Sequence, residues 1–230
     1  MKLQLPSVTL ICVDCRNVDD GIKAMRRCTD QVDFGAVKML THMTTDYEYK
    51  VEIQNIYTLV MYSVFMLKEI YKYVDTEHML IVQRDGWILN PNSWRLKWFD
   101  LDYIGAVFNQ EDKVGNGGFS FRSKRLMKSV SDKCPAWDGT LEDANRVQKE
   151  VGLYEDGVIS MSLRRQLENE GFVYGTLYDA GRFSQGGNEN LNYYDPYPFG
   201  FHGSWRAFDQ HTGFVQPNVK HDGFIPEPLI

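Results

Sequence analysis

The feature that most constrains the fold of this chain is an apolar run that ends abruptly in polar residues. Met79–Val82 has the composition of a buried strand, and Gln83, Arg84 and Asp85 follow it directly, then Gly86. In open α/β sheets, ligands bind just beyond the carboxyl ends of the strands. A carboxylate at that point can hold a divalent cation that bridges the protein to phosphate oxygens. The same residues also suit an ordinary Asp-Gly turn, so this stretch alone leaves both interpretations open.

The remainder of the first hundred residues alternates predicted strands with predicted helices. Val8–Val13 has the pattern of the first, central strand and ends in Asp14, and Phe34–Leu40 is the next strand. Helices are expected over 19–27, where acidic residues come first and basic residues last, and over 51–73, where apolar residues recur every three to four positions. This alternation predicts an α/β protein with a doubly wound, mostly parallel central sheet flanked by helices.

The second half of the chain is more irregular. Its predicted elements are a short helix over 94–99, a strand over 102–108, a helix opened by Ser123, helices over 140–151 and 156–171, and a short strand over 172–175. Residues 185–192 resemble a polar loop, and 216–230, with three prolines, an extended tail. No linker-like tract and no internal repeat is visible, so we expect a single domain over residues 1–230.

Net charge limits the partners that this protein can have. The formal charge of −6 and the pI of about 5.4 argue against a large nonspecific nucleic-acid surface. A local basic run nevertheless extends from Arg122 to Lys133, and most runs of this kind are solvated faces.

Cysteine and hydropathy patterns indicate a cytoplasmic protein. The four cysteines are Cys12, Cys15, Cys28 and Cys134. They lack the second C-x-x-C pair that a zinc site would need, so we interpret them as reduced, partly buried thiols. The amino terminus lacks the apolar core of a signal peptide, and the most apolar predicted helix, over 56–70, carries Lys68 and Glu69. We therefore expect no membrane span.

Three further stretches carry residues of chemical interest. Three glycines lie within four positions in the run Val114–Ser123. The run has neither the G-x-x-x-x-G-K-[ST] nor the G-x-G-x-x-G pattern of phosphate-binding loops. The glycines instead indicate a stretch of backbone that another group approaches closely. Glu155 and Asp156 begin a predicted helix, where a carboxylate can simply be a cap. His202 lies between glycines among aromatic residues, where a solitary histidine is often structural.

Seven stretches, in order along the chain, together resemble one family of small, mostly uncharacterised proteins assigned to GT-A-type glycosyltransferases. They are the first strand with Asp14, Gln83–Asn90, Asp102–Ala106, Val114–Ser123, Glu155-Asp156, Ala180–Ser184 and Phe199–Gly203. The runs G-N-G-G-F-S-x-R-S and F-G-F-H-G are the specific parts, and the resemblance extends over residues 6–206.

The resemblance implies a GT-A-like fold, a nucleotide-sugar donor, a Mn²⁺ or Mg²⁺ ion, and transfer to an acceptor hydroxyl. Many GT-A enzymes hold the metal with a D-x-D motif, of which this chain keeps only Asp85, and His202 matches the family's late histidine. Glu155 and Asp156 match the carboxylate pair that supplies the base in many inverting members, and we assign the base to Asp156. The metal would stabilise the leaving diphosphate, and the base would take the proton of the acceptor hydroxyl.

Further site residues follow from this interpretation. We expect a UDP-sugar donor contacted by Asp14, Arg84, Asp85 and Gly86, although Asp14 equally suits a turn at the strand end. The residues expected on the acceptor side are Asn116, Gly117, Gly118 and Trp87. The acceptor is either a surface glycan or a hydroxymethylated base in phage DNA, and in the second case the basic run 122–133 would contact the DNA backbone.

Two other classes of protein remain open. A sugar nucleotidyltransferase would need a glycine-rich, lysine-bearing loop after the first strand, and residues 14–18 supply none. A non-catalytic glycan- or nucleotide-sugar-binding protein would have no need of Asp85, Asp156 and His202 together. The sequence does not indicate the oligomeric state.

Overall fold

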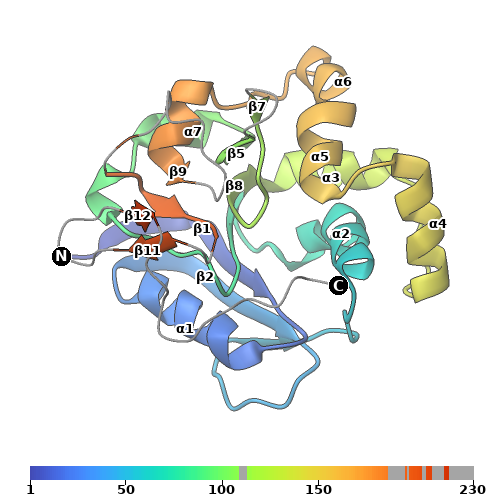
Figure 1. Cartoon of the computed structure of the whole chain (residues 1–230), viewed down its shortest axis with the longest axis horizontal. Helices are drawn as coiled ribbons and strands as arrows, with labels where there is room; N and C mark the ends of the chain where they lie inside the picture. Colours follow the sequence, from blue (N-terminus) through green and yellow to red (C-terminus); the bar gives the residue numbers. More distant parts are fainter. Residues whose placement is uncertain (109–112, 186–194, 196, 204–205, 209–214, 218–230) are drawn as a thin grey trace.

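The computed structural model describes residues 1–108, 113–185, 195, 197–203, 206–208 and 215–217. Its centre is a six-stranded sheet with the strand order β3-β2-β1-β4-β8-β5 (Figure 1). The strands are β1 (Leu3–Val13), β2 (Val32–Thr41), β3 (Lys50–Glu52), β4 (His78–Val82), β5 (Tyr103–Gly105) and β8 (Phe119–Ser123). Strands β3, β2, β1 and β4 are parallel, whereas β8 is antiparallel to both β4 and β5. The expected α/β class with a mostly parallel central sheet is confirmed.

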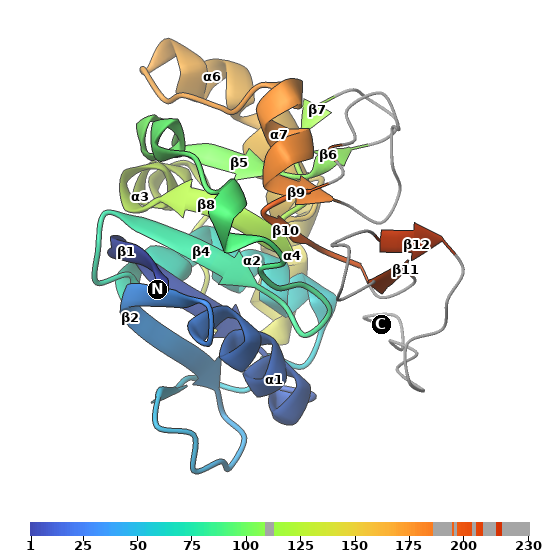
Figure 2. The same cartoon turned by 90° about the vertical axis from the view of Figure 1, so that its left-hand side faces the viewer.

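Helices cover both faces of this sheet (Figure 2). The α-helices are α1 (Val18–Thr29), α2 (Leu59–Lys68), α3 (Lys124–Lys133), α4 (Leu141–Val151), α5 (Glu155–Gly157), α6 (Arg164–Asn169) and α7 (Leu177–Phe183). Helix α1 packs against β1, β2 and β4 on one face, and α2 packs against α3 and α4 on the other. Side chains that accept a hydrogen bond from the first turn cap these helices at Asn17, Thr58, Ser123, Thr140 and Thr176. The helix start expected at Ser123 is therefore confirmed.

Shorter elements complete the described fold. The 3₁₀ helices are η1 (Ile70–Tyr73), η2 (Pro91–Ser93) and η3 (Leu96–Asp100), and a π-helical segment, η4 (Val158–Ser162), separates α5 from α6. The two-stranded pairs are β6 (Val107–Phe108) with β7 (Lys113–Val114), β9 (Ser184–Gln185) with β10 (Gly200–Phe201), and β11 (Arg206–Phe208) with β12 (Val215–Pro217).

The helix expected over residues 51–73 is wrong in its first third. Lys50–Glu52 instead forms the edge strand β3, and α2 begins only at Leu59, where the Thr58 hydroxyl caps it. A β-branched residue such as Val51 loses side-chain freedom in a helix and packs well in a strand. Pairing with the edge of β2 therefore outweighs the helical spacing of the apolar residues in this segment.

Four other predicted elements differ in type or length. The short helix over 94–99 is replaced by 3₁₀ turns, which are common in short connections. The strand over 102–108 is divided because the chain leaves the sheet after Gly105 to pair β6 with β7. The helix over 156–171 contains η4, for which the sequence carries no local signal. The strand over 172–175 is reduced to one bridge between Tyr174 and Tyr103.

A cluster of buried aromatic rings fixes the segment 197–203. The ring of Phe199 is fully buried and lies 5.0 Å from that of Trp94 and 5.8 Å from that of Phe183. Aromatic pairs at this spacing contribute about 0.5–1.5 kcal/mol each beyond their area of burial. The Phe199 carbonyl also accepts a hydrogen bond from Leu89 N at 2.8 Å. The residues just after Phe199 are thereby held beside the end of β4.

Three remaining expectations concern membranes, cysteines and the carboxyl-terminal region. No helix in the described part of the chain is both long and apolar enough to cross a bilayer. The four cysteines are free and their side chains are buried. Most of the expected polar loop (186–192) and most of the expected tail (218–230) lie outside the described residues.

Candidate active site

Two parallel strands end side by side and bring charged residues together at one edge of the sheet. Because β1 and β4 are parallel and pair as far as Cys12 and Val82, Asp14, Arg84 and Asp85 follow at the same edge of the sheet. Arg84 Nη1 lies 3.9 Å from Asp14 Oδ2, and both side chains are at most 14% exposed. Asp14 Oδ1 accepts hydrogen bonds from the backbone N–H groups of Arg16 and Asn17 at 2.8 Å. Asp14 is thus part of a turn, and its contact with a donor stays a prediction.

A segment from much later in the chain crosses over Asp85. The Gly203 N–H donates to the Asp85 carbonyl at 3.0 Å, and His202 Nε2 lies 3.3 Å from Asp85 Oδ1. Gly86 makes this crossing possible, because a Cβ at that position would lie 2.6 Å from the carbonyl oxygen of Phe201. The structure therefore brings the two predicted metal ligands together.

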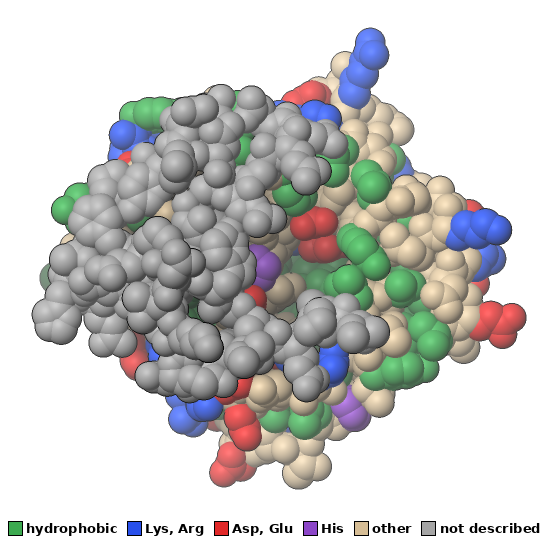
Figure 3. All heavy atoms as spheres, viewed as in Figure 1, with side chains coloured by type: hydrophobic (Ala, Val, Ile, Leu, Met, Phe, Trp, Pro, Cys, Tyr) green, Lys and Arg blue, Asp and Glu red, His purple; other side chains and the backbone are tan. Residues whose placement is uncertain are grey.

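The electrostatics of this pair favour the charged form of both groups. Burial opposes ionisation of Asp85 and of His202, but their mutual attraction and hydrogen bond outweigh it. The pKa of Asp85 is lowered and the pKa of His202 is raised, the latter with help from the Asp156 and Glu155 carboxylates. Figure 3 shows a histidine and acidic side chains gathered in the middle of this face of the molecule.

The side-chain oxygen and nitrogen atoms near the end of β4 are spaced as some of the ligands of a divalent ion would be. Neighbouring ligands of an octahedral ion, each about 2.1 Å from the metal, lie about 3 Å apart. Asp85 Oδ1 and His202 Nε2 meet that spacing at 3.3 Å, and Gln83 Oε1 lies 3.0 Å from the same nitrogen. Over the described ranges, no group of three or more His, Cys, Asp and Glu side chains forms a metal cage. The set suits Mn²⁺ or Mg²⁺ completed by phosphate and water oxygens.

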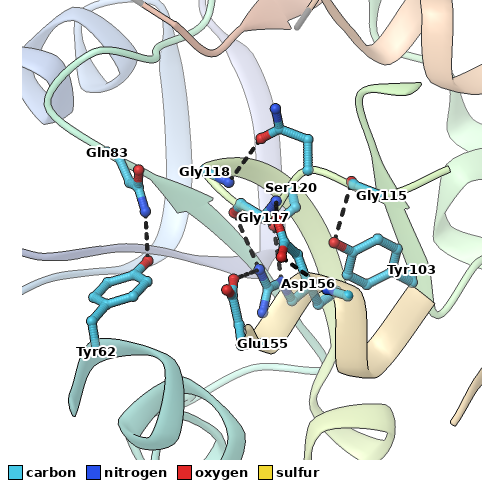
Figure 4. Close-up of polar contacts among 12 residues, drawn as sticks. Tyr62, Gln83, Tyr103, Gly115, Gly117, Gly118, Ser120, Glu155 and Asp156 are labelled. Atoms are coloured by element: carbon cyan, nitrogen blue, oxygen red, sulfur yellow. Dashed lines mark hydrogen bonds and ion pairs between the residues drawn. The ribbon is translucent and has the colours of Figure 1, made fainter. Parts of the chain in front are cut away.

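The glycine-rich run (residues 114–118) packs against the side chains of this site (Figure 4). A Cβ at Gly118 would overlap the imidazole of His202, and a Cβ at Gly117 would overlap the carboxylate of Glu155. Glycine is therefore required at both positions by the close approach of the protein's own side chains. The acceptor-side role of the run stays a prediction.

Arg122 and Glu155 form a buried ion pair beneath this run. Arg122 Nη2 lies 3.0 Å from Glu155 Oε1, and the two side chains are 0% and 7% exposed. Arg122 also donates to the Gly117 carbonyl at 3.1 Å and to Ser120 Oγ at 2.9 Å. Burial and the neighbouring charge of Asp156 raise the pKa of Glu155 to about 7, although Arg122 opposes this. The pair holds the glycine-rich run to the start of α5.

Asp156 is the more accessible of the two neighbouring carboxylates. Helix α5 begins at Glu155, so the helix start predicted here is confirmed. Asp156 is partly exposed and accepts hydrogen bonds from Gly117 N at 3.1 Å and Gly157 N at 2.8 Å. It lies close enough to His202 to raise the pKa of the imidazole. The Asp156 carboxylate can accept a hydrogen bond from a hydroxyl group that enters the site, whereas the Glu155 carboxylate is held in its buried ion pair.

Three side chains at this site have roles that the sequence patterns do not predict. Gln83 lies against His202 and donates from its amide to the Tyr62 hydroxyl at 2.8 Å, which links β4 to α2 (Figure 4). Arg122 had been placed in a surface basic run, and this is wrong because its side chain is fully buried. The signal that pointed to Arg122 was its place in the run G-N-G-G-F-S-x-R-S, next to the glycines.

Trp87, expected on the acceptor side, has its ring between two other elements. The Arg27 guanidinium of α1 lies 3.9 Å from the centre of the indole, and the Phe201 ring packs edge-on at 4.6 Å. These contacts place Trp87 beside α1 and β10. Its contact with an acceptor stays a prediction.

Replacing Gly117 by alanine should lower the free energy of unfolding by about 1–3 kcal/mol. The new Cβ would overlap the Glu155 carboxylate and lie 2.7 Å from Arg122 Nη2, and neither buried side chain has room to move. Urea denaturation followed by circular dichroism measures the change. Gly157→Ala is the comparison variant, because its Cβ would meet the exposed Leu153 side chain at 3.1 Å, a tight contact but one that involves no buried charged group. Equal stability of Gly117→Ala and wild type would contradict the described packing.

Comparison of sequences shows the family of this protein. The family model described as "Protein of unknown function (DUF5672)" matches residues 46–202, and the chain belongs to this family. The matched range contains Asp85, Asp156 and His202 and leaves out Asp14. No curated protein matches the chain.

Two solved structures are similar to the chain at low identity. One is a glycosyltransferase involved in the glycosylation of the major capsid of PBCV-1, with 12% identity, 86% of this chain and 92% of that chain covered, and a TM-score of 0.44. The other is the mannosyltransferase PcManGT from Pyrobaculum calidifontis, in complex with GDP-Man and Mn²⁺, with 11% identity, coverage of 65% and 54%, and a TM-score of 0.37.

Proposed function

We propose that this protein is a metal-dependent glycosyltransferase that moves a sugar from a nucleotide-sugar donor, a UDP-sugar, to an acceptor hydroxyl. The observation that carries the proposal is the meeting of Asp85, His202 and Asp156 at one edge of the sheet. Asp85 and His202 offer ligand atoms for a divalent ion, and Asp156 offers a carboxylate that a hydroxyl can reach. This edge is where open α/β sheets bind their ligands.

Each residue then has a defined part in the reaction. Asp85 and His202 would hold Mn²⁺ or Mg²⁺, which when bound neutralises charge on the leaving diphosphate. Arg84, with Asp14 and Gly86, would contact the donor. Asp156 would take the proton of the acceptor hydroxyl while the acceptor oxygen bonds to the sugar carbon and the bond to the diphosphate breaks.

The state of the basic run bears on the choice between the two acceptors. Arg122 is buried, and the other four basic side chains of the run have partners within the chain. The pairs are Lys124 with the Val74 carbonyl, Arg125 with Asp102, Lys128 with Asp132, and Lys133 with Glu170. Binding to DNA phosphates would compete with these contacts. This favours a glycan acceptor over a modified base in DNA, with Asn116, Gly117, Gly118 and Trp87 on the acceptor side.

The buried core supports the proposal that residues 1–230 act as one domain. Buried apolar side chains from both halves of the described chain belong to one cluster, which runs from Leu5 in β1 to Phe199 beside β10. The glycine-rich run and α5, in the second half, complete a site whose metal ligand Asp85 lies in the first half.

Titration calorimetry with UDP tests the binding half of this function. We expect UDP to bind at least about tenfold more tightly with Mn²⁺ than with a chelator, because one carboxylate and one imidazole leave coordination positions that only the diphosphate and water fill. GDP and CMP are the comparison ligands for the base. Binding of free sugars without any binding of UDP would instead indicate a glycan-binding protein.

A further inference from the structure

The amide of Asn116 contacts one ring nitrogen of His202, and the other nitrogen faces Asp85. Asn116 Oδ1 lies 2.8 Å from His202 Nδ1, and the same oxygen accepts a hydrogen bond from Gly118 N at 3.2 Å. Since a backbone N–H can only donate, the amide atom that it faces is the oxygen and not the nitrogen. A bare Nδ1 would oppose this oxygen with its own lone pair. The imidazole Nδ1 must therefore carry a proton and donate it to Asn116.

The other ring nitrogen faces one partner that can adapt, Gln83, and one that can only accept, Asp85. His202 Nε2 lies 3.0 Å from Gln83 Oε1 and 3.3 Å from Asp85 Oδ1. Gln83 can present either amide atom to the ring, because the Tyr62 hydroxyl that it contacts can both donate and accept. The Asp85 carboxylate attracts a proton to Nε2 and so favours the doubly protonated ring, in agreement with the raised pKa of His202. When the ring loses one proton, Asn116 Oδ1 at 2.8 Å, whose orientation is fixed by Gly118 N, holds the remaining proton at Nδ1 in preference to Asp85 Oδ1 at 3.3 Å. The neutral imidazole thus keeps its proton at Nδ1 and its lone pair at Nε2, beside Asp85.

The backbone at Asn116 is held in a conformation that favours glycine. Its φ of 42° is the one positive φ of a non-glycine residue over the described ranges. Such a conformation costs about 1–3 kcal/mol for a non-glycine residue, although asparagine adopts it more readily than most. A glycine would fit this backbone without strain and would lack the amide. The strained backbone is what aims the amide at the ring.

We propose that Asn116 is a positioning residue that holds His202 in the tautomer protonated at Nδ1 and so aims the Nε2 lone pair at a divalent ion shared with Asp85. The ion itself rests on the proposed function, whereas the tautomer is a property of the metal-free protein. Metal-bound histidines commonly donate their second N–H to a protein acceptor, and loss of that acceptor typically costs about 10–100-fold in metal affinity.

Two substitutions separate the amide from the backbone conformation. Asn116→Gly keeps the positive φ and removes the acceptor, and Asn116→Asp keeps an acceptor oxygen that also tolerates this φ. Two-bond ¹H–¹⁵N spectra of metal-free, histidine-labelled protein at alkaline pH report the tautomer, and His202→Gln assigns the signal. We expect the Nδ1–H form in wild type and in Asn116→Asp, and a mixture with the Nε2–H form in Asn116→Gly.

Calorimetry of Mn²⁺ binding in the presence of UDP is the second readout. We expect affinity to fall by about 10–100-fold in Asn116→Gly and to stay within about threefold of wild type in Asn116→Asp. An Asn116→Gly protein that keeps the Nδ1–H tautomer or the wild-type Mn²⁺ affinity would overturn the proposal, as would loss of the tautomer in Asn116→Asp. Wild-type protein that shows the Nδ1–H form but binds no Mn²⁺–UDP would overturn the proposed function and the metal part of this proposal, and would support the tautomer part.

Discussion

Asp85→Asn should lower kcat/KM for sugar transfer by about 10³-fold and abolish the gain in UDP affinity that Mn²⁺ provides. The substitution keeps the shape of the side chain and removes its charge, so the ligand that lies 3.3 Å from His202 Nε2 becomes a neutral amide. A divalent ion contributes several kcal/mol to stabilising a leaving diphosphate, and about 1.4 kcal/mol corresponds to a factor of ten in rate. Calorimetry with UDP and Mn²⁺ and steady-state kinetics measure the two effects.

The matched control for this prediction is Asp132→Asn. Asp132 lies on α3, is exposed, and pairs only weakly with Lys128, so the variant loses the same charge far from the site. It should bind Mn²⁺–UDP as wild type does. If Asp85→Asn also bound Mn²⁺–UDP as tightly as wild type, Asp85 would not be a metal ligand.

Asp156→Asn should reduce kcat by about 10²–10⁴-fold and leave the dissociation constant of Mn²⁺–UDP within about threefold of wild type. The reason is that the proton of the acceptor hydroxyl moves only in the transition state, so its acceptor contributes to kcat and not to donor binding. Asparagine keeps one of the two acceptor oxygens, so it can still accept from Gly117 N or from Gly157 N, but not from both as Asp156 does. Single-turnover transfer assays alongside calorimetry separate the two quantities.

Asp143→Asn is the control for this substitution. Asp143 also lies in the first turn of a helix, α4, and accepts a hydrogen bond from a backbone N–H, that of Asp138 at 3.0 Å. Transfer by Asp156→Asn at a rate within about threefold of wild type would leave the residue with only a structural part, as the acceptor for Gly117 N and Gly157 N. The anomeric configuration of the product is a second check, since a retaining outcome removes the need for a base at this position.

The end of β4 could be predicted because its signal is local. Four apolar residues followed by Gln83, Arg84 and Asp85 specify both a buried strand and the point where it ends, whatever the rest of the chain does. The helix start at Ser123 is equally local, since it depends on the Ser123 hydroxyl and the first turn after it. Most of the α/β architecture follows from such signals.

The site itself could not be derived from local patterns. His202 reaches Asp85 because Phe199 is buried in a cluster of rings from several elements, and only the family resemblance singled the histidine out. Arg122 is buried because Glu155, far away in sequence, neutralises it. The edge strand β3 and the antiparallel direction of β8 likewise depend on pairing partners that the sequence of each segment does not reveal.

A donor-turnover screen tests the central claim most directly. Wild-type protein is incubated with UDP-, GDP- and CMP-sugars, each with Mn²⁺ and each with EDTA, and ³¹P NMR follows release of the free nucleotide. We predict release of UDP from a UDP-sugar with Mn²⁺, faster when simple acceptor glycans are added, and none with EDTA, in Asp85→Asn or in His202→Ala. Folded protein that turns over none of these donors, or turns one over equally well with EDTA, would contradict the assignment as a metal-dependent glycosyltransferase.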